Sequence, residues 1–133
     1  MESKGVVVVV DDDARILQSL AGLLESVGYK AEVFPSAEMF LQSGVATKAR
    51  CVVADIGMPG MNGAVLREVL KRDYPGLPVI LITGRNELAD IYEIDKLDVL
   101  HFFEKPFQTR RLLAAIELVA RKPPHPDDRN VGE

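Results

Sequence analysis

Cysteine is nearly absent from this chain of 133 residues, which contains only Cys51. A single cysteine excludes a disulfide framework within the chain and a metal site built on several thiolates. Cys51 precedes the apolar residues 52–54, so we expect it to be a small buried hydrophobe rather than a reactive thiol.

Long hydrophobic runs are also lacking. No apolar segment of the sequence approaches the roughly 20 residues that a membrane-spanning helix requires. The apolar run at residues 6–10 is too short, and too quickly followed by aspartates, for a signal peptide. We therefore expect no association with a membrane and a cytoplasmic location.

Positive charge is not concentrated anywhere in the chain. It has 16 lysine and arginine residues against 20 aspartate and glutamate residues, a formal net charge of −4, and the basic residues are scattered. A nucleic-acid-binding domain is expected to gather them on one face or stripe. This distribution argues against direct nucleic-acid binding by this chain.

Five short apolar runs alternate with longer segments of helical character. The runs are mostly continuous and β-branched, which is typical of strands covered on both faces. They lie at residues 6–10, 30–34, 51–54, 78–82 and 100–103. The alternation predicts an α/β fold with a mostly parallel sheet. Right-handed crossovers would place helices on both faces of that sheet.

The segments between the runs have the spacing of amphipathic helices. The first has an apolar stripe from Ile16 to Val27, and Gly28 stands where a helix C′ residue belongs. The other helices are expected after Ser36, after Asn62, over residues 86–97 and around the apolar face of Leu112, Leu113, Ile116 and Val119. Residues 122–133 are polar, rich in proline and without periodicity. We therefore predict one domain over residues 1–121 and a tail or the start of a linker over 122–133.

Polar residues follow the predicted strands directly. In open α/β sheets, ligands bind beyond the carboxyl ends of the strands. The residues brought to that edge are Asp11, Asp12, Asp13, Asp55, Thr83 and Lys105. Four separate strands would thus contribute a group of carboxylates, one hydroxyl and one ammonium to a single place.

This set of groups suits phosphoryl transfer. Several carboxylates within a few ångströms repel one another strongly in a medium of low dielectric constant. A hard divalent cation relieves the repulsion, and Mg²⁺ suits one or two carboxylates together with phosphate oxygens. One carboxylate can then attack phosphorus to give an aspartyl phosphate. Lys105 would supply a charge for the phosphoryl oxygens and Thr83 a hydroxyl donor.

Each of these residues also has an ordinary structural explanation when it is taken alone. Asp13 is better explained as a helix N-cap than as a ligand. Threonine is common at strand ends, and Lys105 and Pro106 would fit an ordinary loop. Asp55 is different, because it directly follows an apolar run, where an unpaired acid would be costly. The order and joint placement of the set favour function.

The chain resembles the receiver domains of two-component response regulators over residues 5–121. The motifs that carry the resemblance are VVVDDD at residues 8–13, DIGMPGMNG at 55–63, ITG at 82–84 and FEKPF at 103–107. The resemblance implies a doubly wound five-stranded parallel sheet in the flavodoxin-like order 2-1-3-4-5, with helices on both faces.

The resemblance also implies the residues that accept phosphate and bind metal. Asp55 would be the phosphoacceptor. Asp12 and Asp55 would ligate Mg²⁺ directly, the backbone carbonyl of Gly57 would be a third protein ligand, and Asp11 would act mainly through water.

Further roles are implied for the residues around the phosphoryl group. Thr83 and Lys105 would contact it, and the peptide bond between Lys105 and Pro106 would be cis. Thr83 would also act as a switch with Phe102, reshaping the face formed by the helix at 86–97, the fifth strand and the last helix. The acid-rich residues 87–98 depart from the family pattern, and we expect that helix to be shifted, shortened or mobile.

Other functions are less compatible with the sequence. A phosphohydrolase of the haloacid-dehalogenase type would share the strand followed by aspartates, but position 15 is arginine rather than threonine and no acidic pair follows a further strand. A receiver acting only as an interaction module would not need the complete set of site residues. A nucleotide-binding fold would need a glycine-rich loop after the first strand, and none is present.

The resemblance finally implies a signalling protein rather than a metabolic enzyme. A histidine kinase or a histidine phosphotransfer protein would phosphorylate it. A homodimer could form through the face of the helix at 86–97 and the last helix, although nothing in the residues requires one. The output would be a separate protein target or, if the chain is a fragment, its own output domain. The sequence names neither the kinase nor the output.

Overall fold

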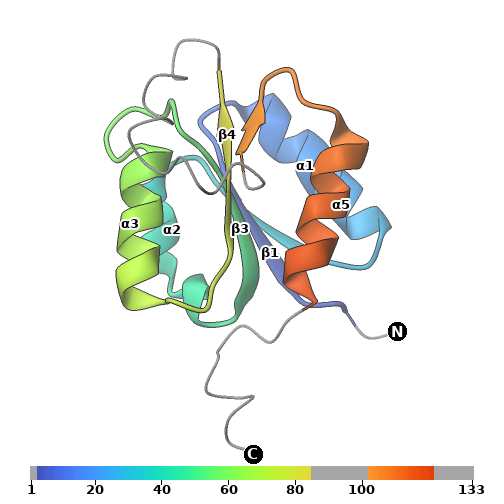
Figure 1. Ribbon diagram of the computed structural model, residues 1–133, viewed down its shortest axis with the longest axis horizontal. Helices are drawn as coiled ribbons and strands as arrows, with labels where there is room; N and C mark the ends of the chain where they lie inside the picture. Colours follow the sequence, from blue (N-terminus) through green and yellow to red (C-terminus); the bar gives the residue numbers. More distant parts are fainter. Residues whose placement is uncertain (1–2, 85–101, 122–133) are drawn as a thin grey trace, which may run out of the picture.

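The computed structural model describes residues 3–84 and 102–121, and a five-stranded parallel sheet forms its centre (Figure 1). The elements in chain order are β1 Val6–Val10, α1 Ala14–Ser26, β2 Lys30–Phe34, α2 Ala37–Ser43, the 3₁₀ helix η1 Val45–Thr47, β3 Ala49–Asp55, α3 Gly63–Asp73, β4 Val79–Thr83, β5 Phe102–Glu104 and α5 Thr109–Ala120. The strand order is β2-β1-β3-β4-β5, which confirms the predicted doubly wound α/β fold.

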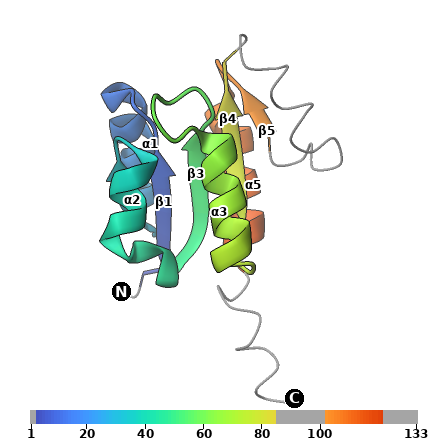
Figure 2. The same ribbon diagram turned by 90° about the vertical axis from the view of Figure 1, so that its left-hand side faces the viewer.

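Helices cover both faces of the sheet. Figures 1 and 2 show α2 and α3 on one face and α1 and α5 on the other. The interior strand β1 contributes to both layers, because alternate residues of a strand point to opposite faces. Val8 and Val10 pack toward α2 and α3, whereas Val7 and Val9 pack toward α1 and α5. This burial on both sides explains why β1 is a continuous run of valines rather than an alternating pattern.

β1 and β2 coincide with the ranges predicted for them, whereas the ends of the later strands differ from the predicted ranges by one or two residues. β3 covers residues 49–55 rather than 51–54, and β4 covers 79–83 rather than 78–82. Of the run predicted at 100–103, the described part forms a strand at 102–104. Hydrogen bonding to neighbouring strands sets these ends, as in the pairing of Asp55 with Ile82. The amino-acid composition of a segment does not show where that pairing stops.

The helix ends agree with their sequence signals. The side chains of Asp13, Ser36 and Asn62 accept hydrogen bonds from the backbone amides of Arg15, Met39 and Val65, respectively, and so cap α1, α2 and α3. Gly28 follows α1 with a φ of 105°, a conformation that glycine adopts without steric cost.

Two of the predicted segments lie outside the described residues, namely the helix over 86–97 and the tail over 122–133. In the part of the chain that is described, no helix has the length and apolar character needed to cross a membrane. Cys51 is fully buried in β3, and burial raises the pKa of its thiol to about 12. That location agrees with the prediction of a buried hydrophobe.

Candidate functional site

The carboxyl ends of β1 and β3 bring three aspartates together. These strands are neighbours in the sheet, with Val10 paired to Ala54, so the residues that follow each strand meet at the same edge. Asp11, Asp12 and Asp55 each place a carboxylate oxygen within 4.8 Å of the other two. The convergence predicted from the sequence is therefore present in the fold.

Asp11 is the most buried of the three, with 1% of its surface exposed. Its Oδ1 accepts a hydrogen bond of 2.8 Å from the amide of Asp13. Its Oδ2 is buried and accepts no hydrogen bond from any residue that the structure describes. That oxygen forms an ion pair with Nζ of Lys105 at 3.4 Å. Such a buried, half-satisfied carboxylate is costly and favours a cationic ligand.

The pKa of Asp11 reflects this environment. The pKa is raised overall from 3.8 to about 6, mainly by burial and in part by repulsion from Asp55, against the lowering effects of the Asp13 amide and of Lys105. One ammonium group therefore compensates the two buried carboxylates incompletely.

Asp55 is held by one hydrogen bond on each carboxylate oxygen. Oδ1 accepts from the amide of Gly57 at 3.1 Å, and Oδ2 accepts from Nζ of Lys105 at 3.3 Å. The residue is 4% exposed and ends β3. These two bonds fix the orientation of the carboxylate at the carboxyl edge of the sheet.

Lys105 reaches this edge from the loop after β5. Its backbone amide donates to the carbonyl of Thr83 at 2.7 Å, and the peptide bond between Lys105 and Pro106 is cis. Burial lowers the pKa of the Lys105 ammonium, but attraction to Asp11 and Asp55 outweighs this and the net direction is upward. The side chain is therefore a stable cation beside both acids.

Thr83 ends β4 and is buried. Its hydroxyl donates to the carbonyl of Gly84 at 2.9 Å rather than to the aspartates. Phe102 of β5 is paired with Leu81 of β4, and both side chains pack toward α2 and α3. Because Thr83 is two residues after Leu81, Thr83 and Phe102 project from the same face of the sheet.

The other two aspartates of the run at 11–13 have different environments. Asp12 is exposed. Asp13 caps α1 and forms an ion pair of 3.3 Å with Arg15, whose hydrogen bond lowers the pKa of the Asp13 carboxyl. Asp13 therefore has the structural role that the sequence favoured for it.

The close approach of α3 to the end of β3 was not predicted from the sequence. A Cβ atom on Gly63 would lie 2.5 Å from the backbone oxygen of Asp55 and 3.0 Å from Cα of Ile56. The amide of Gly63 also donates to the carbonyl of Ile56 at 3.3 Å. The sequence contained Gly63 within a motif, but the contact itself depends on the fold.

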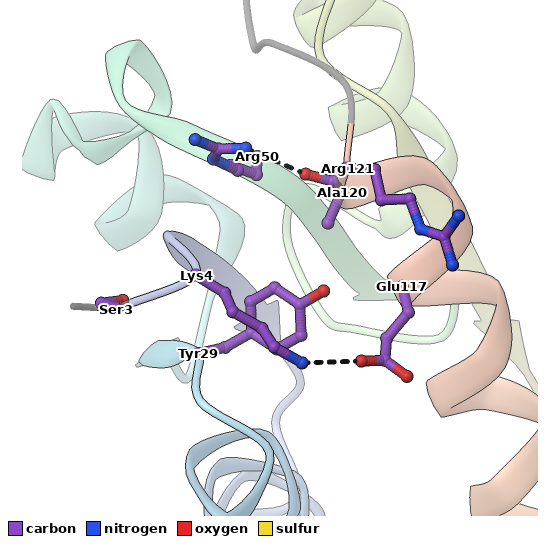
Figure 3. Close-up of a pocket in the computed structure, with 7 residues that line it drawn as sticks. All are labelled: Ser3, Lys4, Tyr29, Arg50, Glu117, Ala120 and Arg121. Atoms are coloured by element: carbon purple, nitrogen blue, oxygen red, sulfur yellow. Dashed lines mark hydrogen bonds and ion pairs between the residues drawn. The ribbon is translucent and has the colours of Figure 1, made fainter. Parts of the chain in front are cut away.

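A separate pocket of about 470 Å³ lies at the amino-terminal edge of the sheet (Figure 3). There Nζ of Lys4 lies over the ring of Tyr29, 5.1 Å from the ring centroid, and forms an ion pair of 3.0 Å with Oε2 of Glu117 in α5. Nη1 of Arg50 donates to the carbonyl of Ala120 at 3.4 Å. These contacts tie the start of β1 and β3 to the end of α5, at the opposite end of the sheet from the aspartates.

The sequence of this chain matches a known protein family over most of its length. The response regulator receiver domain family matches residues 7–117 of the chain. This range contains the three aspartates that converge, together with Thr83 and Lys105.

Named relatives point to the same family. The transcriptional regulatory protein FixJ of Bradyrhizobium diazoefficiens is 37% identical over 122 residues, which are 92% of this chain and 60% of FixJ. The response regulator protein TodT of Pseudomonas putida is 32% identical over 119 residues, or 90% of this chain and 52% of TodT. This chain therefore spans between about half and three fifths of the length of these relatives.

A solved structure gives the corresponding comparison of folds. Full-length FixJ from B. japonicum superposes with a TM-score of 0.80 at 35% sequence identity, covering 96% of this chain and 62% of that chain. The similarity thus extends over almost all of this chain.

Proposed function

The chain belongs to the response regulator receiver domains of two-component systems, and from that premise we propose that it is a switch in which Asp55 accepts a phosphoryl group. The donor is a histidine kinase or a histidine phosphotransfer protein. The observation that carries the proposal is the convergence of Asp11, Asp12 and Asp55 with the ammonium of Lys105 at one edge of the sheet.

The residues at this edge fit a magnesium ion. Three carboxylates offer oxygens within 4.8 Å of one another, and Oδ2 of Asp11 is buried without a hydrogen bond from the described residues. Oxygen ligands of this kind suit a hard divalent cation. We assign Asp12, Asp55 and the carbonyl of Gly57 as direct ligands and Asp11 as a ligand through water. When bound, Mg²⁺ would offset the negative charge of the carboxylates and of the incoming phosphoryl oxygens.

Asp55 is the nucleophile in this proposal. A carboxylate oxygen of Asp55 forms a bond to phosphorus, while the bond from phosphorus to the donor's histidine nitrogen breaks and its electron pair stays on the donor. The Gly57 amide holds Oδ1, which orients the carboxylate for the reaction. Lys105 supplies positive charge next to the phosphoryl oxygens, a contribution of positioning and electrostatics that phosphoryl transfer mainly requires.

Thr83 and Phe102 couple the site to the surface. The Thr83 hydroxyl would exchange its bond to the Gly84 carbonyl for a bond to a phosphoryl oxygen. Phe102 lies on the same face of the sheet and is partly buried, so it would repack when Thr83 moves. The face beside β5 and α5 would then change its affinity for a partner or for a second copy of the chain.

The output follows from the same proposal. Relatives such as FixJ are named as transcriptional regulators and are longer than this chain. We propose that the phosphorylated domain acts on a protein target, or on an output domain where the chain continues beyond residue 133, and does not itself contact nucleic acid. It works as a signalling component in the cytoplasm, assisting its own phosphorylation and dephosphorylation, and residues 122–133 form a tail or linker.

The test is the intact mass of the protein after incubation with acetyl phosphate, with and without Mg²⁺. We expect a gain of one phosphoryl group that needs Mg²⁺ and is absent in Asp55→Asn. No gain under any condition would overturn the proposal and favour an unphosphorylated interaction module. Steady phosphate release that persists in Asp55→Asn but stops in Asp11→Asn would instead indicate a phosphohydrolase.

A further inference from the structure

The loop between β3 and α3, residues 56–62, carries Gly57, whose amide orients Asp55. Figure 2 shows this loop at the end of the sheet where α2 begins. The position of the loop therefore decides where the Gly57 amide and carbonyl lie relative to the acidic cluster.

A carboxylate from α2 holds this loop. Oε2 of Glu38, in the first turn of α2, accepts a hydrogen bond of 3.0 Å from the amide of Met61, 23 residues away in the chain. This bond, together with that from its own backbone amide, lowers the pKa of Glu38, so the side chain is an ionised acceptor at neutral pH. An ionised acceptor makes a stronger hydrogen bond than a neutral one.

Gly60 permits the approach of Glu38 to the loop. It has a φ of 71°, and a Cβ atom at this position would lie 2.9 Å from Oε2 of Glu38. The absence of a side chain at residue 60 thus allows both the left-handed turn and the approach of the carboxylate.

Apolar packing joins the same two elements beneath this contact. Ala37 and Phe40 of α2 share a buried cluster with Ile56 and Met58 of the loop, and Met61 packs against that cluster. The loop is therefore held on α2 by a buried apolar layer and, at its outer side, by the carboxylate of Glu38.

We propose that Glu38 is a positioning residue for the phosphoacceptor site, a role that rests on the function proposed above. By fixing Met61 it restrains the loop, so that the Gly57 amide stays on Oδ1 of Asp55 and the Gly57 carbonyl stays at the acidic edge. Glu38 touches neither the phosphoryl group nor the reacting carboxylate. Its effect reaches the site only through the backbone of residues 57–61.

The experiment compares Glu38→Ala and Glu38→Gln with the native chain. Glutamine keeps an oxygen acceptor for the Met61 amide but has no charge, whereas alanine removes the acceptor. Glu25→Ala is the matched control, because Glu25 is an exposed glutamate in the last turn of α1, at the opposite end of the sheet. The readouts are the rate of mass gain with acetyl phosphate over a series of Mg²⁺ concentrations and the exchange rates and shifts of the Met61 and Gly57 amides by NMR.

We expect Glu38→Ala to slow phosphorylation by about fivefold and to raise the half-saturating Mg²⁺ concentration, since one charged hydrogen bond restrains the loop. Its Met61 amide should exchange faster and its Gly57 amide should shift. Glu38→Gln should recover most of the rate, and Glu25→Ala should match the native chain.

Two results would overturn the proposal. One is native phosphorylation with an unshifted Gly57 amide in Glu38→Ala. The other is a loss in Glu38→Gln as large as in Glu38→Ala, which would mean that charge, and not the hydrogen bond to the loop, matters. If the native chain takes up no phosphoryl group at all, the proposed function fails separately, and the Gly57 amide shift still decides whether Glu38 positions the loop.

Discussion

Nζ of Lys105 lies 3.3 Å from Oδ2 of Asp55, although the two residues are 50 positions apart in the chain. The same nitrogen lies 3.4 Å from Oδ2 of Asp11. One cation is thus shared by two carboxylates that are almost fully buried. The ammonium of Lys105 only partly offsets the negative charge of the two carboxylates. Burial and repulsion from Asp55 therefore raise the pKa of Asp11.

Replacing Lys105 with methionine should destabilise the fold in the absence of divalent cations. The variant keeps an apolar stem but leaves Asp11 and Asp55 without their ammonium partner. We expect the free energy of unfolding at pH 7 to fall by about 1–3 kcal/mol. Urea denaturation in EDTA would measure this, with Lys48→Met, a change at an exposed lysine, as control. A Lys105 variant as stable as the native chain would argue against the shared ion pair.

Replacing Asp11 with asparagine should stabilise the metal-free protein at neutral pH. The folded pKa of about 6 lies above the ordinary value of 3.8, so the folded state binds the proton more tightly than the unfolded state. Protonated Asp11 therefore makes its whole contribution to the free energy of unfolding below about pH 4. That contribution is lost as the pH rises through about 6. In EDTA at pH 7.5 we expect Asp11→Asn to be more stable than the native chain by roughly 1–3 kcal/mol.

The Asp11→Asn difference should shrink at pH 4, where native Asp11 is already protonated. Asparagine still offers an oxygen to the Asp13 amide, which keeps that hydrogen bond in the variant. Urea midpoints at both pH values give the measurement. Equal stability of the two proteins at pH 7.5 would contradict the costly burial of this carboxylate.

Gly63→Ala should disturb the phosphoacceptor strand, because the new methyl group would meet the backbone oxygen of Asp55 at 2.5 Å. Backbone atoms cannot rotate away as a side chain can, so we expect a loss of roughly 1–3 kcal/mol of stability together with slower phosphorylation. Gly22→Ala is the matched control, since no described atom lies within 4 Å of a Cβ at that position of α1. It should gain about 0.5–1 kcal/mol from higher helix propensity. Similar effects of the two substitutions would refute the close approach.

Asp13→Ala should separate the structural aspartate from the chemical ones. It removes the N-cap of α1, and we expect the melting temperature to fall by roughly 3–6 °C. Mg²⁺-dependent phosphorylation should remain close to native once the protein is folded, because the Asp13 side chain is bonded to Arg15, and the backbone amide that donates to Asp11 is kept in the variant. Phosphorylation rates below the melting transition test this. A loss as large as that in Asp55→Asn would place Asp13 in the site.

Much of the fold and of the site could be predicted because both depend on where strands end. A parallel sheet brings the carboxyl ends of its strands to one edge, so residues that directly follow apolar runs meet there whatever their separation in the chain. Asp11, Asp12 and Asp55 were identified in this way, and the caps Asp13 and Ser36 were identified from local backbone chemistry.

The contacts that shape the site could not be predicted in the same way. Glu38 looked like an ordinary polar residue on a helix surface, and nothing in its spacing relates it to Met61. The burial of Asp11 was equally hidden, since its neighbour Asp12 is exposed despite identical chemistry. Such features depend on how closely helices, strands and loops approach one another, and these distances leave no periodic pattern in the sequence.

By itself the sequence determined the class of fold, the edge at which the chemistry lies and the family to which the chain belongs. Apolar periodicity and strand-end residues are local, and they are written directly in the order of residues. Only the tertiary structure decided which carboxylate is buried, that Lys105 pairs with two of them, that Gly63 lies against the backbone of Asp55, and that Glu38 bonds to Met61. These relationships arise because packing sets desolvation and close approach at a scale of a few ångströms, between residues far apart in the chain.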